Sequence, residues 1–137
     1  SVLQNNYNLM NRNEYESDVR EVVAQAGIAH APYYGLASGF LTGKYRPGIE
    51  VDSQRARGAA KMLDARGIAV LAALDEVAER HQVPVASVAL AWLYAQPTIG
   101  APIASARTVE QLNELLPMAT LHLSPAEIAS LSAASQI

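Results

Sequence analysis

Short apolar runs alternate with longer amphipathic segments along the chain. The apolar runs lie at positions 2–4, 28–31 and 99–104 and are too short for helices, so each is typical of a buried strand. The segments between them carry apolar residues at helical spacing. This order predicts right-handed βαβ units and a parallel sheet. Three strands cannot close a barrel, so the chain is either a small three-stranded α/β layer or part of something larger.

The helical periodicity is clearest in the middle of the chain. From Ile68 to His81, apolar residues line one side of the predicted helix and charged residues line the other. The segment 85–95 is apolar on nearly every side, which predicts a deeply buried helix with Trp92 as its largest core group. Another helix is predicted over 56–66, and Gly67 is expected to interrupt it.

Capping residues mark the beginnings of further helices. The capping-box spacing occurs at Asn13 and Glu16, at Thr108 and Gln111, and at Ser124 and Glu127 with Pro125 at the first helical position. The apolar faces are expected to comprise Val19, Val22, Val23 and Ala26 in the first helix, Leu112, Leu115 and Leu116 in the second, and Ile128 and Leu131 in the third.

Two loops separate these elements. The segment 31–45 places Tyr33, Tyr34 and several glycines directly after the second strand. It is either a ligand site, as α/β folds often have at strand ends, or a loop that needs glycine for its turns. Residues 46–57 are the most polar stretch and predict a long surface loop. That loop is either a lid whose arginines face an anion or a solvated connection.

Composition narrows the class of protein. Half of the 137 residues are hydrophobic, 17% are charged and the formal net charge is −3. These values indicate a globular domain and argue against nucleic acid or an anionic membrane as a partner. The absence of cysteine excludes disulfides and thiolate metal sites and fits a cytoplasmic protein. No apolar stretch approaches the ~20 residues of a membrane-spanning helix.

Several common catalytic and nucleotide-binding motifs are absent. Lys44 follows Gly43, but Ser38 stands where a P-loop needs its first glycine and Tyr45 follows where it needs a serine or threonine. No GxGxxG motif follows a predicted strand, and there is no GxSxG motif. The histidines are scattered without a carboxylate at ligand spacing, so no metal site is predicted.

Polar side chains follow each predicted strand, and the carboxyl ends of parallel strands meet at one edge of a sheet. Gln4 and Asn6 follow the first strand. The second strand is followed by Tyr33, Leu36 and Ser38. The third is followed by Ser105, Ala106, Arg107, Gln111 and Glu114. A helix N-terminus at the third strand end favours a phosphate, to which Arg107 adds a guanidinium. An amide, an aromatic plane and an anion site in one row suit an extended nucleotide with a flat, amide-bearing ring.

Four blocks of sequence resemble the aldo-keto reductase family in their order and spacing. They are VLQNNYNLMNR, APYYGLASGFLTGKYRPG, PVASVALAWLYAQP and PIASARTVEQLNELL. The resemblance covers nearly the whole chain. It implies an α/β fold that is a partial (β/α)8 barrel, with three parallel strands, the sixth to the eighth, and their helices in a single incomplete domain. It also implies an enzyme that uses NADPH to reduce aldehydes and ketones.

The resemblance further implies roles for individual residues. Gln4 would bind the nicotinamide carboxamide, Tyr33 would stack on the nicotinamide ring, Leu36 and Ser38 would follow the pyrophosphate, Ser105, Ala106 and Arg107 would hold the 2′-phosphate, and Gln111 and Glu114 would contact the adenosine. Gly35, Ala104 and Leu115 depart from the residues that the family often has at these positions, and Leu115 removes a polar contact to adenine.

No catalytic residue is assigned to this chain, because the family's catalytic tyrosine, aspartate, lysine and histidine come from earlier strands. Tyr33 and Lys44 do not take those roles. The sequence therefore predicts the cofactor-binding portion of an NADP-dependent reductase, which acts on a small carbonyl substrate in the complete enzyme and is inactive alone. The alternative is a non-catalytic nucleotide-binding or interaction module. Exposed sheet edges predict association with a missing N-terminal half or with a second copy.

Overall fold

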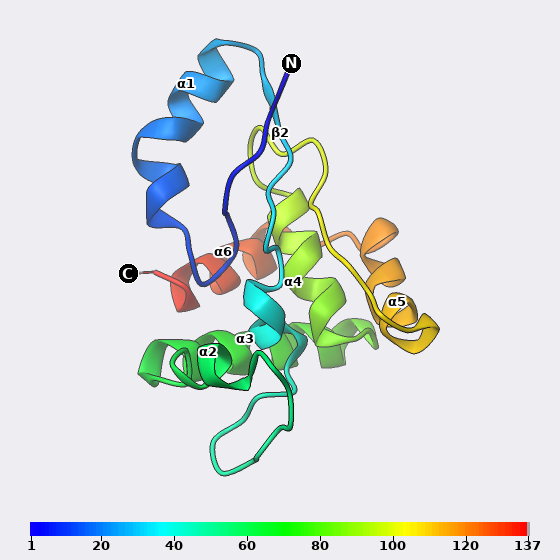
Figure 1. Cartoon of the computed structure of the whole chain (residues 1–137). Helices are drawn as coiled ribbons and strands as arrows, with labels where there is room; N and C mark the ends of the chain where they lie inside the picture. Colours follow the sequence, from blue (N-terminus) through cyan, green and yellow to red (C-terminus); the bar gives the residue numbers. More distant parts are fainter. Residues whose placement is uncertain (137) are drawn as a thin grey trace.

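In the computed structural model, which describes residues 1–136, two short parallel strands lie against a set of helices (Figure 1). The strands are β1 (Val2–Leu3) and β2 (Ala29–His30). The helices are α1 (Arg20–Gln25), α2 (Ala56–Ala60), α3 (Ala65–His81), α4 (Val85–Tyr94), α5 (Val109–Leu115) and α6 (Pro125–Ala134). Single turns of tighter or wider helix form η1 (Tyr15–Val19), η2 (Ala37–Thr42) and η3 (Leu116–Ala119).

The two strands pair in parallel, as the sequence predicts. Val2 lies opposite Ala29, and the pairing continues past the strands as a bridge between Asn6 and Tyr33. A parallel pair requires a crossover connection, which η1 and α1 supply between β1 and β2. The residues that follow both strands therefore emerge at the same edge of the sheet.

The predicted third strand at 99–104 is wrong as a regular strand. This segment runs along the other side of β2, but it forms only a single bridge, at Ile99, and one further backbone bond, from the Ile103 nitrogen. Pro102 has no N–H to donate and Gly100 weakens a strand, which explains the interruption. The sheet thus has two regular strands and an extended third segment.

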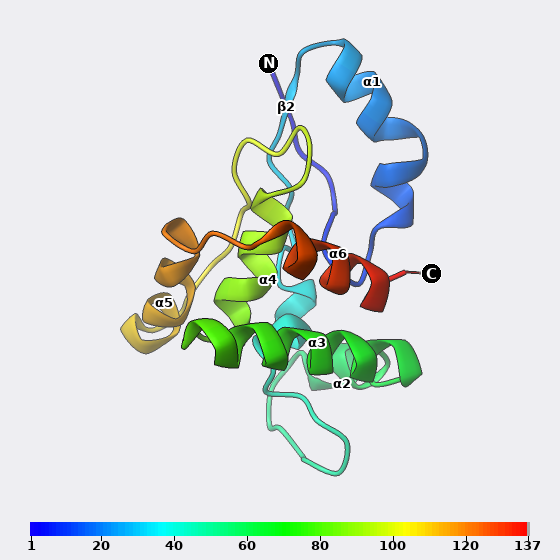
Figure 2. The same ribbon diagram turned by 180° about the vertical axis from the view of Figure 1, so that it is seen from behind.

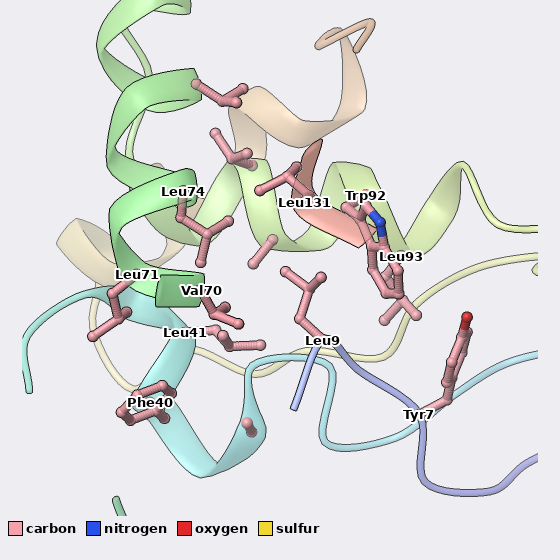
Figure 3. Packing of buried hydrophobic residues seen from close by; sticks show 14 of the residues in the cluster. Tyr7, Leu9, Phe40, Leu41, Val70, Leu71, Leu74, Trp92, Leu93 and Leu131 are labelled. Atoms are coloured by element: carbon pink, nitrogen blue, oxygen red, sulfur yellow. The ribbon is translucent and has the colours of Figure 1, made fainter. Parts of the chain in front are cut away.

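The hydrophobic core lies between α3, α4 and α6. Figure 2 shows α3 and α6 crossing the molecule side by side, with α4 passing beside them. The core side chains with at most 2% exposure include Val70, Leu71 and Leu74 of α3, Trp92 and Leu93 of α4, and Leu131 of α6. In Figure 3, Leu9 from the segment after β1 lies between Val70 and Trp92. The predicted burial of α4 around Trp92 is confirmed.

Gly67 does not interrupt a helix but lies inside the first turn of α3. The helix begins at Ala65, and the Asp64 carboxylate accepts a hydrogen bond of 2.8 Å from the Gly67 nitrogen. A side chain at position 67 would place its Cβ 1.7 Å from the carbonyl oxygen of Met62. Glycine is therefore needed for the close approach of the preceding turn. The α2 helix is also shorter than predicted, since it ends at Ala60.

The capping boxes have mixed outcomes. Ser124 and Glu127 form the full box at the start of α6, and the Thr108 hydroxyl caps α5 by accepting from the Gln111 nitrogen. Asn13 caps nothing, because the chain is already helical there. The Glu16 carboxylate instead accepts hydrogen bonds from Arg12 and from the Tyr7 hydroxyl, which attaches the first helical segment to the core.

Within residues 1–136, the predicted apolar face of α5 is not covered and that of α1 is covered only in part. Val22 of α1 is 63% exposed, although Val23 beside it is buried. The α5 helix buries none of its residues, and Leu112 and Leu116 are 44% and 56% exposed. The helices therefore form as the periodicity predicts, while part of their apolar side remains exposed in the described residues.

Candidate functional site

A groove with a volume of about 630 Å³ lies where the chain leaves β2 and the extended third segment. Three stretches line it: residues 33–45, residues 53–55 and residues 103–115. Small-molecule sites commonly have volumes of ~300–1,000 Å³ and lie at the carboxyl ends of parallel strands. The position and size of this groove therefore fit a small-molecule site.

Most of the strand-end residues predicted from the sequence line this groove together. They are Tyr33, Leu36, Ser38, Ser105, Arg107, Gln111 and Glu114. Gln4, Asn6 and Ala106 are not among the lining residues. Gln4 is exposed at the end of β1, close to the bridge that joins Asn6 to Tyr33, and Ala106 is half-buried in the turn before α5.

One wall of the groove joins the end of the segment 31–45, for which a ligand site was one of two interpretations, to part of the polar loop 46–57, for which a lid was one of two. Lys44 and Tyr45 form its beginning, and residues 53–55 return to complete it. The Lys44 ammonium lies 5.2 Å from the centre of the Tyr45 ring, so it is engaged in a cation–π contact. Of the arginines in the predicted lid, Arg55 lines the groove.

The two tyrosines form an aromatic end to the groove. Tyr33 and Tyr34 meet edge to face, with their ring centres 5.0 Å apart and their planes at 77°. Both remain partly exposed, at 37% and 59%. An aromatic ring held by an edge contact and open on one face can stack on a flat ligand ring.

A backbone turn in an unusual conformation follows the tyrosines. Ala37, Ser38 and Gly39 have φ angles of 50°, 56° and 95°, so three successive residues are left-handed. For a residue other than glycine this costs roughly 1 kcal/mol or more, and the surrounding structure must hold it. Asn8 contributes to this, because its side-chain amide donates a 2.9 Å hydrogen bond to the Tyr34 carbonyl. Ser38 and Gly39 both line the groove.

The far end of the groove is formed by the turn that begins α5. The backbone nitrogen of Arg107 donates a 2.8 Å hydrogen bond to the side-chain carbonyl of Gln111, which fixes the turn. Across residues 1–136, no carboxylate lies within ion-pair distance of the Arg107 guanidinium. A partnerless, exposed guanidinium beside a helix start is suited to a bidentate contact with a phosphate.

The three histidines lie away from the groove. His30 is fully buried against Tyr7 and Tyr15, and burial lowers the pKa of its imidazole. His81 contacts the carboxylate of Glu127 at 3.0 Å, and His122 is exposed. Among residues 1–136, no group of three or more acidic, histidine or cysteine side chains is arranged to hold a metal ion. In the same part of the chain, no helix has the length and apolar character needed to cross a membrane.

The residues of the groove fit a phosphorylated nicotinamide dinucleotide. Tyr33 offers a stacking surface, the left-handed turn at Ser38 brings backbone to the groove, and Arg107 offers a cation. The side-chain carbonyl of Gln111 is already occupied, so only its amide nitrogen is left to face a ligand. These groups suit a flat ring, a diphosphate and a further phosphate, respectively, in such a ligand.

The chain belongs to the aldo/keto reductase family, whose family model matches residues 1–136. Among curated relatives, it is 32% identical over 120 residues to the L-glyceraldehyde 3-phosphate reductase of Escherichia coli K12, covering 82% of this chain and 35% of the relative. It is 30% identical over 139 residues to the protein tas of the same strain, covering 99% of this chain and 40% of the relative.

Solved structures share the fold. A glycerol dehydrogenase from Gluconobacter oxydans superposes with a TM-score of 0.81 at 20% identity, covering 97% of this chain and 41% of that structure. A thermostable aldo-keto reductase bound to the inhibitor epalrestat gives a TM-score of 0.70 at 22% identity, with 97% and 39% coverage. The chain thus spans well under half the length of each of these four proteins.

Proposed function

We propose that this chain forms the cofactor-binding portion of an NADP-dependent aldo-keto reductase. In this proposal, the two strands and the extended third segment are the sixth to eighth strands of a partial (β/α)8 barrel. The observation that carries the proposal is that Tyr33 and Ser38, which follow β2, line one groove together with Arg107, which follows the extended third segment. Family membership and the similar folds of two solved structures support it.

In this proposal, each group of lining residues contacts a different part of the cofactor. Tyr33 stacks on the nicotinamide ring, with Gln4 near its carboxamide, while Leu36 and Ser38 follow the pyrophosphate. Ser105, Ala106 and Arg107 hold the 2′-phosphate, and Gln111 and Glu114 lie against the adenosine. When bound, NADPH supplies the hydride that reduces an aldehyde or ketone. The chain's own residues position the cofactor and exclude water, and none of them serves as the proton donor.

The chain alone is proposed to bind the cofactor without reducing a carbonyl compound. The remaining strands, or a second copy, would cover the open side of the sheet, where Val2 is 66% exposed and the edge of β1 is unpaired within residues 1–136. We also propose a cytoplasmic location, which the absence of cysteine supports. The alternative function is a non-catalytic interaction module, which the exposed apolar residues of α5 favour.

A fluorescence titration tests the cofactor assignment. The purified chain is expected to bind NADPH, and Arg107→Gln should weaken NADPH binding about tenfold or more, since hydrogen bonds to charged groups contribute ~1.5–3 kcal/mol. NADH binding should change less than about twofold, because NADH lacks the 2′-phosphate. Arg57→Gln is the matched control, since Arg57 is exposed but does not line the groove. Failure of the unaltered chain to bind NADPH, or equal losses for both nucleotides, would contradict the proposal.

A further inference from the structure

The wall of the groove formed by the loop 44–55 is attached to the protein at its two ends and through Val51, which is partly buried against the core. Lys44 and Tyr45 line the groove where the loop leaves it, and Ser53, Gln54 and Arg55 line it where the loop returns. The tip of the loop projects away from the molecule as an open turn below α2 (Figure 1). The position of the returning segment therefore depends on how firmly the two ends are held.

A bidentate ion pair holds the first end. The Arg46 guanidinium donates two hydrogen bonds of 2.7 Å to the two carboxylate oxygens of Asp75, in the middle of α3. Its Nε donates a third, also of 2.7 Å, to the carbonyl of Gly43. This fork geometry fixes the guanidinium in one orientation. The ion pair thereby attaches the loop to α3, and neither the Arg46 nor the Asp75 side chain lines the groove.

Glycine at position 43 is required by this arrangement. Gly43 has a left-handed φ of 81°, and a Cβ there would lie 3.0 Å from a terminal nitrogen of Arg46. It would also lie 3.4 Å from the side chain of Val85. The turn therefore leaves just enough room for Arg46 to fold back towards α3.

A second contact joins the two ends of the loop to each other. The hydroxyls of Tyr45 and Ser53 lie 2.8 Å apart, and Tyr45 is only 4% exposed. Because Tyr45 is fixed in the core, this bond holds the returning segment beside the first end. Arg55, which lines the groove two residues further on, is thus kept at the groove by Tyr45 and indirectly by Arg46.

We infer that the Arg46–Asp75 ion pair and the Tyr45–Ser53 hydrogen bond are positioning contacts that hold residues 53–55 against the groove and slow the release of a bound nucleotide. The second half of this inference rests on the proposed function. Neither Arg46 nor Asp75 touches the ligand in this arrangement. Breaking the pair should therefore act on the loop and on the dissociation rate, with little effect on the folded scaffold.

Two measurements on the variants Asp75→Asn and Tyr45→Phe test the inference. The first is the rate of trypsin cleavage after Arg55 and Arg57 in the chain without any nucleotide. The second is the dissociation rate of NADPH, measured by stopped-flow fluorescence. Each variant should raise both rates about two- to fivefold, as expected for loss of a partly exposed ion pair or a single hydrogen bond. Thermal unfolding by circular dichroism checks that the fold is retained.

Glu76→Gln is the matched control, since it neutralises the next residue of α3 and breaks an exposed ion pair with Arg80. It should leave both rates unchanged. Cleavage rates in Asp75→Asn and Tyr45→Phe equal to those of the control would overturn the positioning role. Faster cleavage with unchanged NADPH release would overturn the link to the ligand. If the unaltered chain does not bind NADPH, the proposed function fails, and the cleavage rates still decide whether these contacts position the loop.

Discussion

Between α3, α4 and α6 the core side chains are almost entirely buried, whereas on the sheet side and on α5 large apolar residues stay exposed. Trp92 and Leu131 are 0% exposed, but Val2 and Val109 are 66% and 67% exposed. Periodicity predicted apolar faces in both regions. Only the first region finds its apolar partner within residues 1–136, and under the proposed function another chain segment would cover the second. Substitutions on each side, and at the border between them, test how far this division holds.

The largest effect is expected from a substitution that breaks the tightly packed side. In Gly67→Ala, the new Cβ would lie 1.7 Å from the Met62 carbonyl oxygen and 3.1 Å from the Phe40 ring. Since the first of these atoms is backbone, the turn that contains Met62 must move away from the start of α3. We expect a loss of about 3 kcal/mol in the free energy of unfolding, measured by urea denaturation.

Gly58→Ala provides the control for this prediction. Gly58 lies inside α2, and no heavy atom would lie within 4 Å of an added Cβ. Alanine is the better helix former by ~1 kcal/mol, so this variant should be equally or more stable than the unaltered chain. Similar losses in both variants would show that the destabilisation comes from the helix backbone and not from the approach to Met62.

A smaller effect is expected where α6 is tied to α3. The Glu127 carboxylate is 6% exposed and accepts hydrogen bonds from Arg80, His81 and the Ser124 nitrogen. Burial acts to raise its pKa, but these bonds outweigh burial and lower the pKa to about 2. Glu127→Gln should cost about 2 kcal/mol at neutral pH, because the buried groups lose a charged acceptor.

The pH dependence of unfolding distinguishes this tie from simple packing. Since the pKa of Glu127 is lowered on folding, its contribution is fully present above the unfolded value of 4.5 and is lost as the pH falls towards 2. The difference between the unaltered chain and Glu127→Gln should shrink over that range. Glu76→Gln, which breaks an exposed pair on the same helix, should cost less than ~0.5 kcal/mol at any pH. A constant difference would indicate that the carboxylate charge is not involved.

The sequence predicted the elements whose partners are local. The capping box at Ser124 needs only four residues of chain, and the apolar segment around Trp92 can only be a buried helix. The errors concern tertiary contacts. A glycine within a helical pattern usually signals a helix break, but glycine is needed at position 67 because the Met62 carbonyl approaches so closely. Glu16 was expected to cap the backbone of its own helix, but its carboxylate binds Arg12. At 99–104, Pro102 allows an extended chain and prevents a regular strand.

The convergence of strand-end residues on one groove could be predicted from the sequence, whereas the return of residues 53–55 to that groove could not. Tyr33, Ser38 and Arg107 follow strands, and strand ends converge in a parallel sheet, so topology alone brings them together. The wall at Tyr45 and residues 53–55 depends on a salt bridge between positions 29 residues apart, Arg46 and Asp75. No periodicity or short motif encodes such a pair. The polar composition of residues 46–57 indicated a lid or a surface loop, and only the structure shows that the Arg46–Asp75 ion pair holds it.

The smallest effect is expected at His30, which lies on the border between the sheet and the helical scaffold. The imidazole is fully buried, its ring centre lies 4.1 Å from that of Tyr15, and neither ring nitrogen makes a hydrogen bond of good geometry within residues 1–136. Burial lowers its pKa, and the backbone of Asn5 offsets this only in part, so the folded chain holds it neutral. Replacement by leucine removes two poorly satisfied polar atoms at similar volume. His30→Leu should therefore raise the free energy of unfolding by about 1 kcal/mol at pH 7.

The pH dependence of the free energy of unfolding identifies the cause of that gain. Below about pH 6.5 the unfolded chain binds a proton at His30 that the folded chain resists, so the unaltered chain should lose stability as the pH falls from 7 towards 5. His30→Leu should lack this component, and the gap between the two should widen over the same range, as measured by urea denaturation at each pH. A gap that stays constant would mean that the folded chain protonates His30 as readily as the unfolded chain, so that the border is open to water and not closed like the core beside it.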